Sequence, residues 1–261
     1  MKAKVTMKTL GNTALGRHLG FLGLGKLLNG LLLGSLLLLT QVSRAESISW
    51  LADPVDNNWN NPANWSSGRV PNGLDEVLLG ISTIRNLSIT EPASVADLVF
   101  ETDAQAYIIT AQPGAGLGFS YDIFNDSAFV QNFVAASDGE TSAYFSLNDD
   151  TTSDNTIIGA VTFTQHARNG SNSEAPPLIQ FVFYDAGDAT IHNLGATVPG
   201  GVGGLTSFFY GRASAETCTI INDGATVAGA AGGHTDFPIN SPDAGNATIT
   251  AQGGTNGGAA A

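Results

Sequence analysis

Hydrophobic and polar positions recur at a constant spacing near the C-terminus. The recurring positions are isoleucines, each directly preceded by a threonine: Ile191, Ile220 and Ile249 after Thr190, Thr219 and Thr248. Alternate residues of a strand lie on opposite faces, so stacked copies place the isoleucines in one inner column and the threonines in one outer column. The spacing is 29 residues, and a constant period of this length is typical of a solenoid. The pattern predicts an all-β fold, a right-handed parallel β-helix with about 29 residues per coil.

The same period predicts a second apolar stack, formed by Ile179, Phe208 and Phe237. A β-sandwich with internal duplication is the main alternative, but it predicts two-residue hairpin turns and a spacing of about 8–12 residues per strand. Only Asp223-Gly224 fits such a turn within the repeat. A leucine-rich repeat has a similar period, yet it needs leucines at fixed offsets, and this region has almost none. The parallel β-helix therefore explains the repeat best.

Earlier parts of the chain also show short apolar strand patterns, but without a constant spacing. Residues 81–165 read as short strands rich in β-branched and aromatic residues, separated by polar turns. We expect the β-helix to span 81–261, with regular 29-residue repeats from about 166. Residues 46–80 are rich in Trp, Asn and Pro and contain all three tryptophans. This composition predicts loops pinned by aromatic rings, which we interpret as an N-terminal cap.

The first 45 residues are typical of a signal peptide. A basic segment precedes the leucine-rich run 31–39, and Ser43-Arg44-Ala45 offers small residues at the positions that a signal peptidase recognises. The alternative is an N-terminal membrane anchor, but the apolar run is short, and Lys26 and Asn29 interrupt a longer one. We therefore predict cleavage after Ala45 and an exported mature chain without a membrane span.

Removal of this segment leaves a strongly acidic chain. All 23 acidic residues follow Ala45, whereas residues 46–261 contain only four arginines and no lysine, which gives them a formal charge of −19. Binding to nucleic acid or anionic lipid depends on Lys and Arg, so this balance excludes nucleic acid as a partner. Carboxylate pairs, such as Asp185 with Asp188 or Asp149 with Asp150, are weak candidates for a Ca²⁺ site. The sequence implies no other cofactor. The single cysteine, Cys218, excludes an intramolecular disulfide and fits a small buried side chain.

Three segments resemble a family of large secreted bacterial β-strand-repeat proteins, including those with autotransporter-associated repeats. The first is Asn58-Trp59-Asn60-Asn61-Pro62-Ala63-Asn64-Trp65 with the following Val70-Pro71 and Asp75. The second joins Phe124-Asn125-Asp126-Ser127 to Gln131-Asn132-Phe133, and the third is Ala244-Gly245-Asn246-Ala247-Thr248-Ile249-Thr250. The resemblance covers most of 46–261. It implies a passenger that is released or displayed at the cell surface, for which adhesion is the usual suggestion.

Complete members of that family carry a C-terminal β-barrel or anchor, which this chain lacks. We therefore expect it to be a truncated member of a longer protein class, and attachment to the outer membrane is not implied. The expected partners are host or environmental glycans or surface proteins.

The leading hypothesis is a non-enzymatic, exported β-solenoid with a structural, adhesive or surface-display role. The alternative is a carbohydrate-active β-helix enzyme, a hydrolase or lyase. Its only acidic candidates for paired-carboxylate chemistry are Asp149, Asp150 and Asp154. A third interpretation, sugar binding by Trp59 and Trp65, requires both rings to be exposed. The competing interpretation of these two tryptophans is that they cap the first coil.

Overall fold

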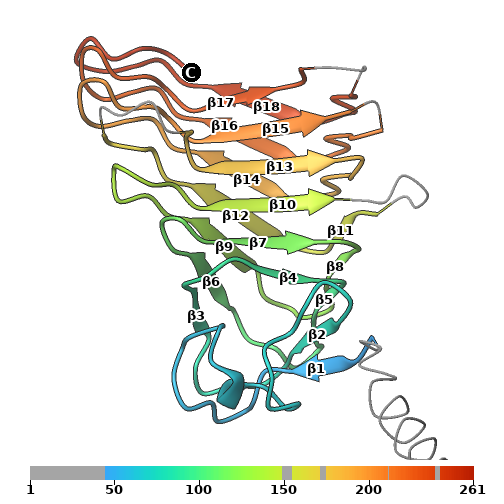
Figure 1. The fold of residues 1–261 in the computed structure, drawn as a ribbon. Helices are drawn as coiled ribbons and strands as arrows, with labels where there is room; N and C mark the ends of the chain where they lie inside the picture. Colours follow the sequence, from blue (N-terminus) through green and yellow to red (C-terminus); the bar gives the residue numbers. More distant parts are fainter. Residues whose placement is uncertain (1–44, 149–154, 171–174, 211, 239–241) are drawn as a thin grey trace, which may run out of the picture. The chain divides into compact units, whose positions relative to one another are not determined.

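The computed structural model describes residues 45–148, 155–170, 175–210, 212–238 and 242–261. They form an all-β parallel β-solenoid of about seven turns, with about 28 residues per turn. Successive strands stack one above another, and a single short 3-10 helix, η1 (Pro62–Asn64), interrupts them among the described residues (Figure 1). The predicted fold class, a β-helix of stacked coils, is thus confirmed. No helix in these ranges is both long and apolar enough to cross a membrane.

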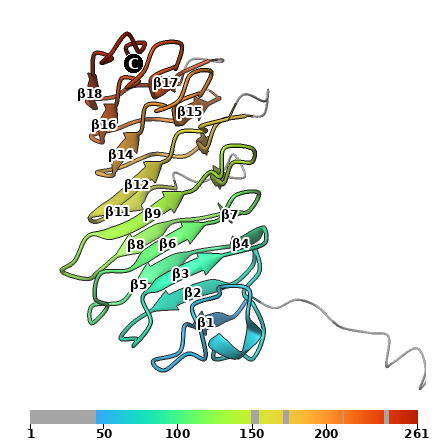
Figure 2. The ribbon, with the colours of Figure 1, turned by 90° about the vertical axis from the view of Figure 1, so that its left-hand side faces the viewer.

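Three parallel sheets build the solenoid, and we name them sheets 1, 2 and 3 (Figures 1 and 2). Sheet 1 has five strands: β1 (Ser47–Ser49), β2 (Glu76–Leu79), β5 (Leu98–Phe100), β8 (Ile123–Asn125) and β11 (Ile157–Ile158). Sheet 2 has six: β4 (Ala93–Val95), β7 (Gly116–Phe119), β10 (Tyr144–Asn148), β13 (Leu178–Val182), β15 (Leu205–Phe209) and β17 (His234–Asp236). Sheet 3 has seven: β3 (Asn86–Ile89), β6 (Ile108–Ala111), β9 (Gln131–Ala135), β12 (Val161–Gln165), β14 (Thr190–Asn193), β16 (Thr219–Asn222) and β18 (Thr248–Ala251).

The interior of sheet 3 is one continuous apolar column. Parallel register joins Leu87, Ile109, Phe133, Phe163, Ile191, Ile220 and Ile249 across its seven strands. The first six are at most 1% exposed, whereas Ile249, in the last strand, is 43% exposed. The predicted isoleucine stack is therefore confirmed and extends over four further strands. The threonines Thr190, Thr219 and Thr248 share a register on the outer face, as predicted.

The second predicted stack is wrong at one of its three members. Ile179 lies opposite Thr206, and Phe208 pairs instead with Phe181. The rings of Phe181 and Phe208 are 4.7 Å apart and nearly coplanar, and Phe237 stacks on Phe208 at 4.9 Å. The physical reason is a shorter coil, because the step along the chain from Phe181 to Phe208 is two positions shorter than that between the stacked isoleucines of sheet 3. A change of two positions preserves the alternation of faces, so the core remains apolar.

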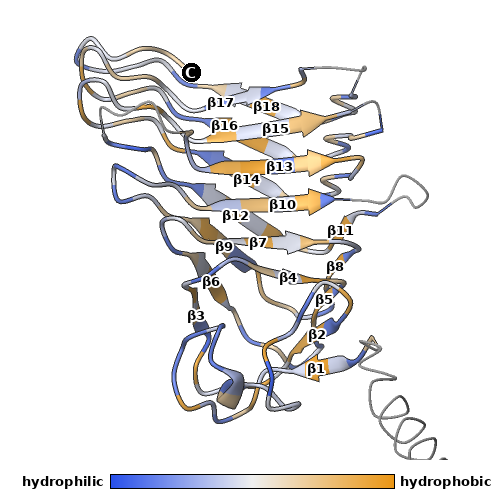
Figure 3. Cartoon of the chain, viewed as in Figure 1, coloured by the Kyte–Doolittle hydropathy of each residue, from blue (hydrophilic) through white to orange (hydrophobic). Residues whose placement is uncertain are grey.

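Residues 46–80 contain both loops and the first solenoid strands. β1 and β2 lie within this segment and pair in parallel in sheet 1, so the coil geometry begins inside it. The rings of Trp50, Trp59 and Trp65 pack edge to face, with centroids 5.0 Å and 4.8 Å apart. All three are at most 3% exposed. Figure 3 shows the resulting pattern, with apolar residues concentrated in strands such as β10 and β13.

Candidate functional site

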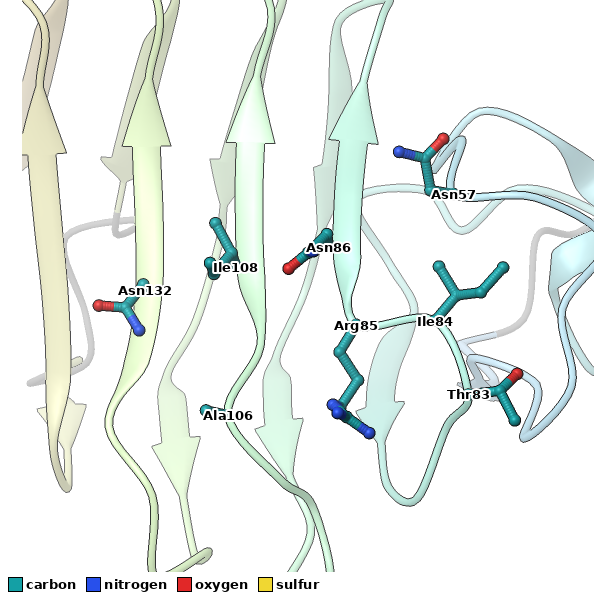
Figure 4. A pocket seen from close by; sticks show the side chains of 8 residues that line it. All are labelled: Asn57, Thr83, Ile84, Arg85, Asn86, Ala106, Ile108 and Asn132. Carbon is teal, nitrogen blue, oxygen red and sulfur yellow. The ribbon is translucent and has the colours of Figure 1, made fainter.

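A shallow groove lies on the outer face of sheet 3, over its first three strands. Its volume is about 470 Å³, and eight residues line it: Asn57, Thr83, Ile84, Arg85, Asn86, Ala106, Ile108 and Asn132 (Figure 4). Most of these side chains are polar, and Ile84, Ala106 and Ile108 are apolar. None of the eight is Asp, Glu, His or Cys, so this groove contains no general acid–base pair. Its side chains can form hydrogen bonds and apolar contacts.

Strand alternation sets the floor of the groove. Asn86, Ile108 and Asn132 are in register on β3, β6 and β9, so their side chains form one outward row (Figure 4). The row arises because the neighbouring Leu87, Ile109 and Phe133 are buried. Ile108 is 41% exposed. The row therefore offers an apolar patch between two amides.

The wall of the groove is a loop that several buried groups hold in place. The Trp50 indole Nε1 donates to the carbonyl of Ile84 at 3.0 Å, and the Ser82 hydroxyl donates to that of Leu51, also at 3.0 Å. The Tyr107 hydroxyl donates to the carbonyl of Gly80 at 2.7 Å. Burial raises the pKa of Tyr107 to about 12, so this hydroxyl remains a donor at neutral pH. The loop conformation is thus set before any ligand arrives.

Arg85 contributes the only charge in the groove. Its Nη1 donates to the carbonyl of Ser82 at 3.0 Å, and its own carbonyl accepts from the amide of Ile108 at 2.9 Å. Arg69 differs, since it forms ion pairs with Asp75 and Glu46 at 2.6 Å and 2.9 Å. Among the described residues Arg85 forms no ion pair. Its remaining guanidinium donors are available to a ligand.

The two tryptophans considered for sugar stacking are buried and do not line the groove. Trp59 is 0% exposed and Trp65 is 2% exposed, so neither ring offers a free face. The Trp65 indole Nε1 donates to the carbonyl of Trp59 at 2.7 Å. Sugar binding by these two rings required exposure, and their burial contradicts it. The rings instead pack into the core at the first coil, as the capping interpretation predicts.

The other sequence candidates are the aspartates considered for acid–base chemistry or Ca²⁺ binding. Asp149, Asp150 and Asp154 lie outside the described residues. Asp188 accepts a hydrogen bond from the hydroxyl of Thr217. The part of the chain that the structure describes contains no group of three or more His, Cys, Asp or Glu residues able to hold a metal ion.

Cys218 is buried, and burial raises the pKa of its thiol to about 12. A thiol in this environment remains protonated and unreactive at neutral pH, which fits its prediction as a small core residue.

A second hollow of about 340 Å³ lies on the outer face of sheet 2. It is lined by Gly114, Thr141, Ser142, Ala143, Tyr144, Ala175, Pro176 and Leu178. The Tyr144 ring lies over Gly116, where an added Cβ would come within 2.5 Å of the ring. Tyr144 is 37% exposed and pairs in register with Leu178 on the next strand. This surface is more apolar than the groove on sheet 3.

Sequence reasoning did not find the groove. A signal was present in the segment Tyr107-Ile108-Ile109, where two adjacent isoleucines in a strand must face opposite sides, so one must be exposed. The loop that supplies Arg85 could not be placed, because its anchors are far away in sequence. No protein-family model matches the chain, and neither the curated proteins nor the solved structures contain a match.

Proposed function

We propose that this β-solenoid is an exported, non-enzymatic protein that acts by adhesion at or beyond the bacterial cell surface. One observation carries the proposal: the outward row of the groove continues along the whole of sheet 3. In register after Asn132 come four threonines: Thr162, Thr190, Thr219 and Thr248. Strands lie about 4.8 Å apart, so the face repeats hydrogen-bonding groups at molecular spacing. Repeated weak contacts of this kind sum to a strong attachment.

Sequence features support the export step. The basic, then leucine-rich segment before Ala45 is that of a signal peptide, and the formal charge of −19 after it favours solubility. The same charge disfavours nucleic acid and anionic membranes as partners. We propose glycans or surface proteins as partners, because a hydroxyl- and amide-rich face can pair with either.

Expression of the full chain with its leader in a Gram-negative host tests both parts. We expect the exported protein to begin at Glu46 by mass spectrometry. We also expect beads coated with it to adhere to glycan-bearing surfaces more than beads coated with albumin. An uncleaved chain retained in the cytoplasm would contradict the export step, and equal adhesion of the two bead types would contradict the adhesive role. Glycan turnover that is lost in Asp150→Ala would overturn the non-enzymatic assignment.

A further inference from the structure

We propose that the groove on sheet 3 binds a neutral, extended glycan. The inference rests on the proposed adhesive function and names the ligand class and the residues that hold it. The central contacts are the amides of Asn57, Asn86 and Asn132, the guanidinium of Arg85 and the aliphatic side chain of Ile108.

The amides match the chemistry of sugar hydroxyls. A hydroxyl both donates and accepts hydrogen bonds, and so does an asparagine side chain. In the described part of the chain, the amide groups of Asn57 and Asn86 have no protein partner, while that of Asn132 donates to the carbonyl of Val130 at 3.3 Å. Asn57 and Asn86 can therefore bind hydroxyls without losing another contact, and Asn132 keeps its second N–H and its side-chain oxygen for a ligand.

Ile108 provides the apolar component of the site. It lies between Asn86 and Asn132 in the same outward row and is 41% exposed. Pyranose rings present apolar C–H groups on their faces and hydroxyls around their edges. A ring seated on Ile108 therefore covers apolar surface while its edge hydroxyls reach the amide on one side, and the next ring along the chain reaches the amide on the other side.

Charge selects a neutral ligand. Residues 46–261 carry a formal charge of −19, which repels a polyanion. Arg85 Nη1 already donates to the carbonyl of Ser82, and the remaining guanidinium donors form a planar set that can also donate to neutral hydroxyls.

The geometry selects an extended ligand. Asn86 and Asn132 are two strand spacings apart, roughly 10 Å, so one sugar ring cannot reach both. A peptide that adds a strand to a sheet needs an unpaired edge. Here the groove lies on a sheet face, and β6 is paired on both of its sides. A chain of several sugar rings laid across the three strands can reach both asparagines and needs no unpaired strand edge.

Isothermal titration calorimetry on the secreted full chain tests the proposal with four hexasaccharides. These are the neutral cellohexaose, xylohexaose and mannohexaose, and the anionic hexagalacturonate. We expect at least one neutral chain to bind and hexagalacturonate to bind at least tenfold more weakly. Asn86→Ala and Asn132→Ala should each weaken binding about tenfold. Ile158→Ala, on sheet 1 and away from the groove, changes a side chain that is 45% exposed and should leave binding unchanged. Ile108→Trp should tighten binding, since an indole offers a larger stacking face.

Three results would overturn the inference: no binding of any neutral chain, tighter binding of hexagalacturonate, or an equal loss in Ile158→Ala. Unfolding curves that match the wild type show that a loss in Asn86→Ala is not misfolding, because this amide is exposed and has no protein partner. Bead adhesion of the groove variants separates the two proposals. Full adhesion by Asn86→Ala, together with no hexasaccharide binding to the wild type, would overturn the groove site and leave the adhesive function standing.

Discussion

Ile191 lies directly below Ile220 in the solenoid, one coil earlier in the chain, and both side chains are fully buried. The relationship shows how the sequence maintains the fold. Over the last three strands of sheet 3 an isoleucine stacks on an isoleucine, so the same side-chain packing repeats from one coil to the next. The threonine beside each isoleucine faces outward, and the same strand therefore serves both the core and the surface.

This alternation predicts that an acidic residue is tolerated on one face only. Ile220→Asp places an unpaired carboxylate between the buried Ile191 and the side chain of Ile249, and we expect it to lower the free energy of unfolding by about 4 kcal/mol or more. Thr219→Asp faces solvent, and we expect a change below about 1 kcal/mol. Urea unfolding followed by circular dichroism measures both variants. Equal destabilisation of the two would contradict the assignment of inner and outer faces.

The regular C-terminal coils could be predicted from sequence because their period is constant. The failure at Ile179 has a specific cause, since the coil that contains it is two positions shorter than those around Ile220. The earlier coils vary more, because the step from Asn86 to its partner Ile108 is much shorter than the step from Asn132 to Thr162. A fixed-period search cannot align such coils, although their strands were recognisable from residue type. Connecting loops absorb the changes in length, and they carry no periodic signal.

A strained turn predicts a stabilising substitution. Gly187, Glu216 and Gly245 occupy the same turn in successive coils and have φ angles of 55°, 48° and 56°. A left-handed φ costs a residue with a Cβ about 1–2 kcal/mol, whereas glycine adopts it freely. We expect Glu216→Gly to gain a net stability of about 0.5 kcal/mol, after the greater entropy of the unfolded glycine chain is subtracted.

Differential scanning calorimetry should place the Tm of Glu216→Gly roughly 1–2 °C above that of the wild type. Glu216→Ala is the control, because it removes the carboxylate and keeps the Cβ, and it should show no gain. An equal rise in both variants would assign the effect to charge rather than to the backbone.

The candidate site was less accessible to sequence reasoning than the fold. Its floor follows from strand alternation, but its wall depends on hydrogen bonds between distant segments, such as Trp50 to Ile84 and Tyr107 to Gly80. The tryptophans attracted a sugar-binding interpretation because their residue type permits it. Their burial shows that residue type alone does not separate a stacking platform from a core contact.

An ion pair near the N-terminal coils predicts a pH dependence. The Arg69 guanidinium binds the buried carboxylate of Asp75 with two hydrogen bonds, of 2.6 Å and 2.8 Å, and lowers the pKa of Asp75. A lowered pKa in the folded state means that the contribution to stability is complete above the unfolded pKa of about 3.9. It is lost as the pH falls through the folded value.

We expect Arg69→Ala to destabilise the protein by about 2 kcal/mol at pH 7, because it leaves a buried carboxylate with fewer donors. The difference from wild type should shrink as the pH falls below about 4, because Asp75 of the variant lacks its guanidinium partner and becomes protonated at a higher pH than Asp75 of the wild type. Chemical unfolding at pH 7 and pH 3 measures the change. Arg85→Ala, which removes an arginine without an ion pair, should show no such dependence. A difference for Arg69→Ala that is the same at both pH values would contradict the account.

The buried amide of Asn64 organises the loop that carries the tryptophans. Its Nδ2 donates to Asp56 Oδ1 at 2.7 Å and to the carbonyl of Asn58 at 2.8 Å, while its Oδ1 accepts from the amide of Val55 at 2.8 Å. Asn64→Leu keeps a similar volume but leaves these groups without a partner. We expect a loss of about 3 kcal/mol in the free energy of unfolding, since each orphaned buried polar group costs about 1–3 kcal/mol.

The loss should lower the Tm by roughly 6–12 °C for a chain of this size. It should also shift the tryptophan emission to longer wavelength, because the loop holds Trp65, which is 2% exposed, against the core. Asn86→Ala is the matched control: its amide is exposed and unpartnered, and its Tm and emission should equal those of the wild type. If Asn64→Leu also leaves both unchanged, the amide does not organise the loop, and the packing of the three indole rings alone must hold it.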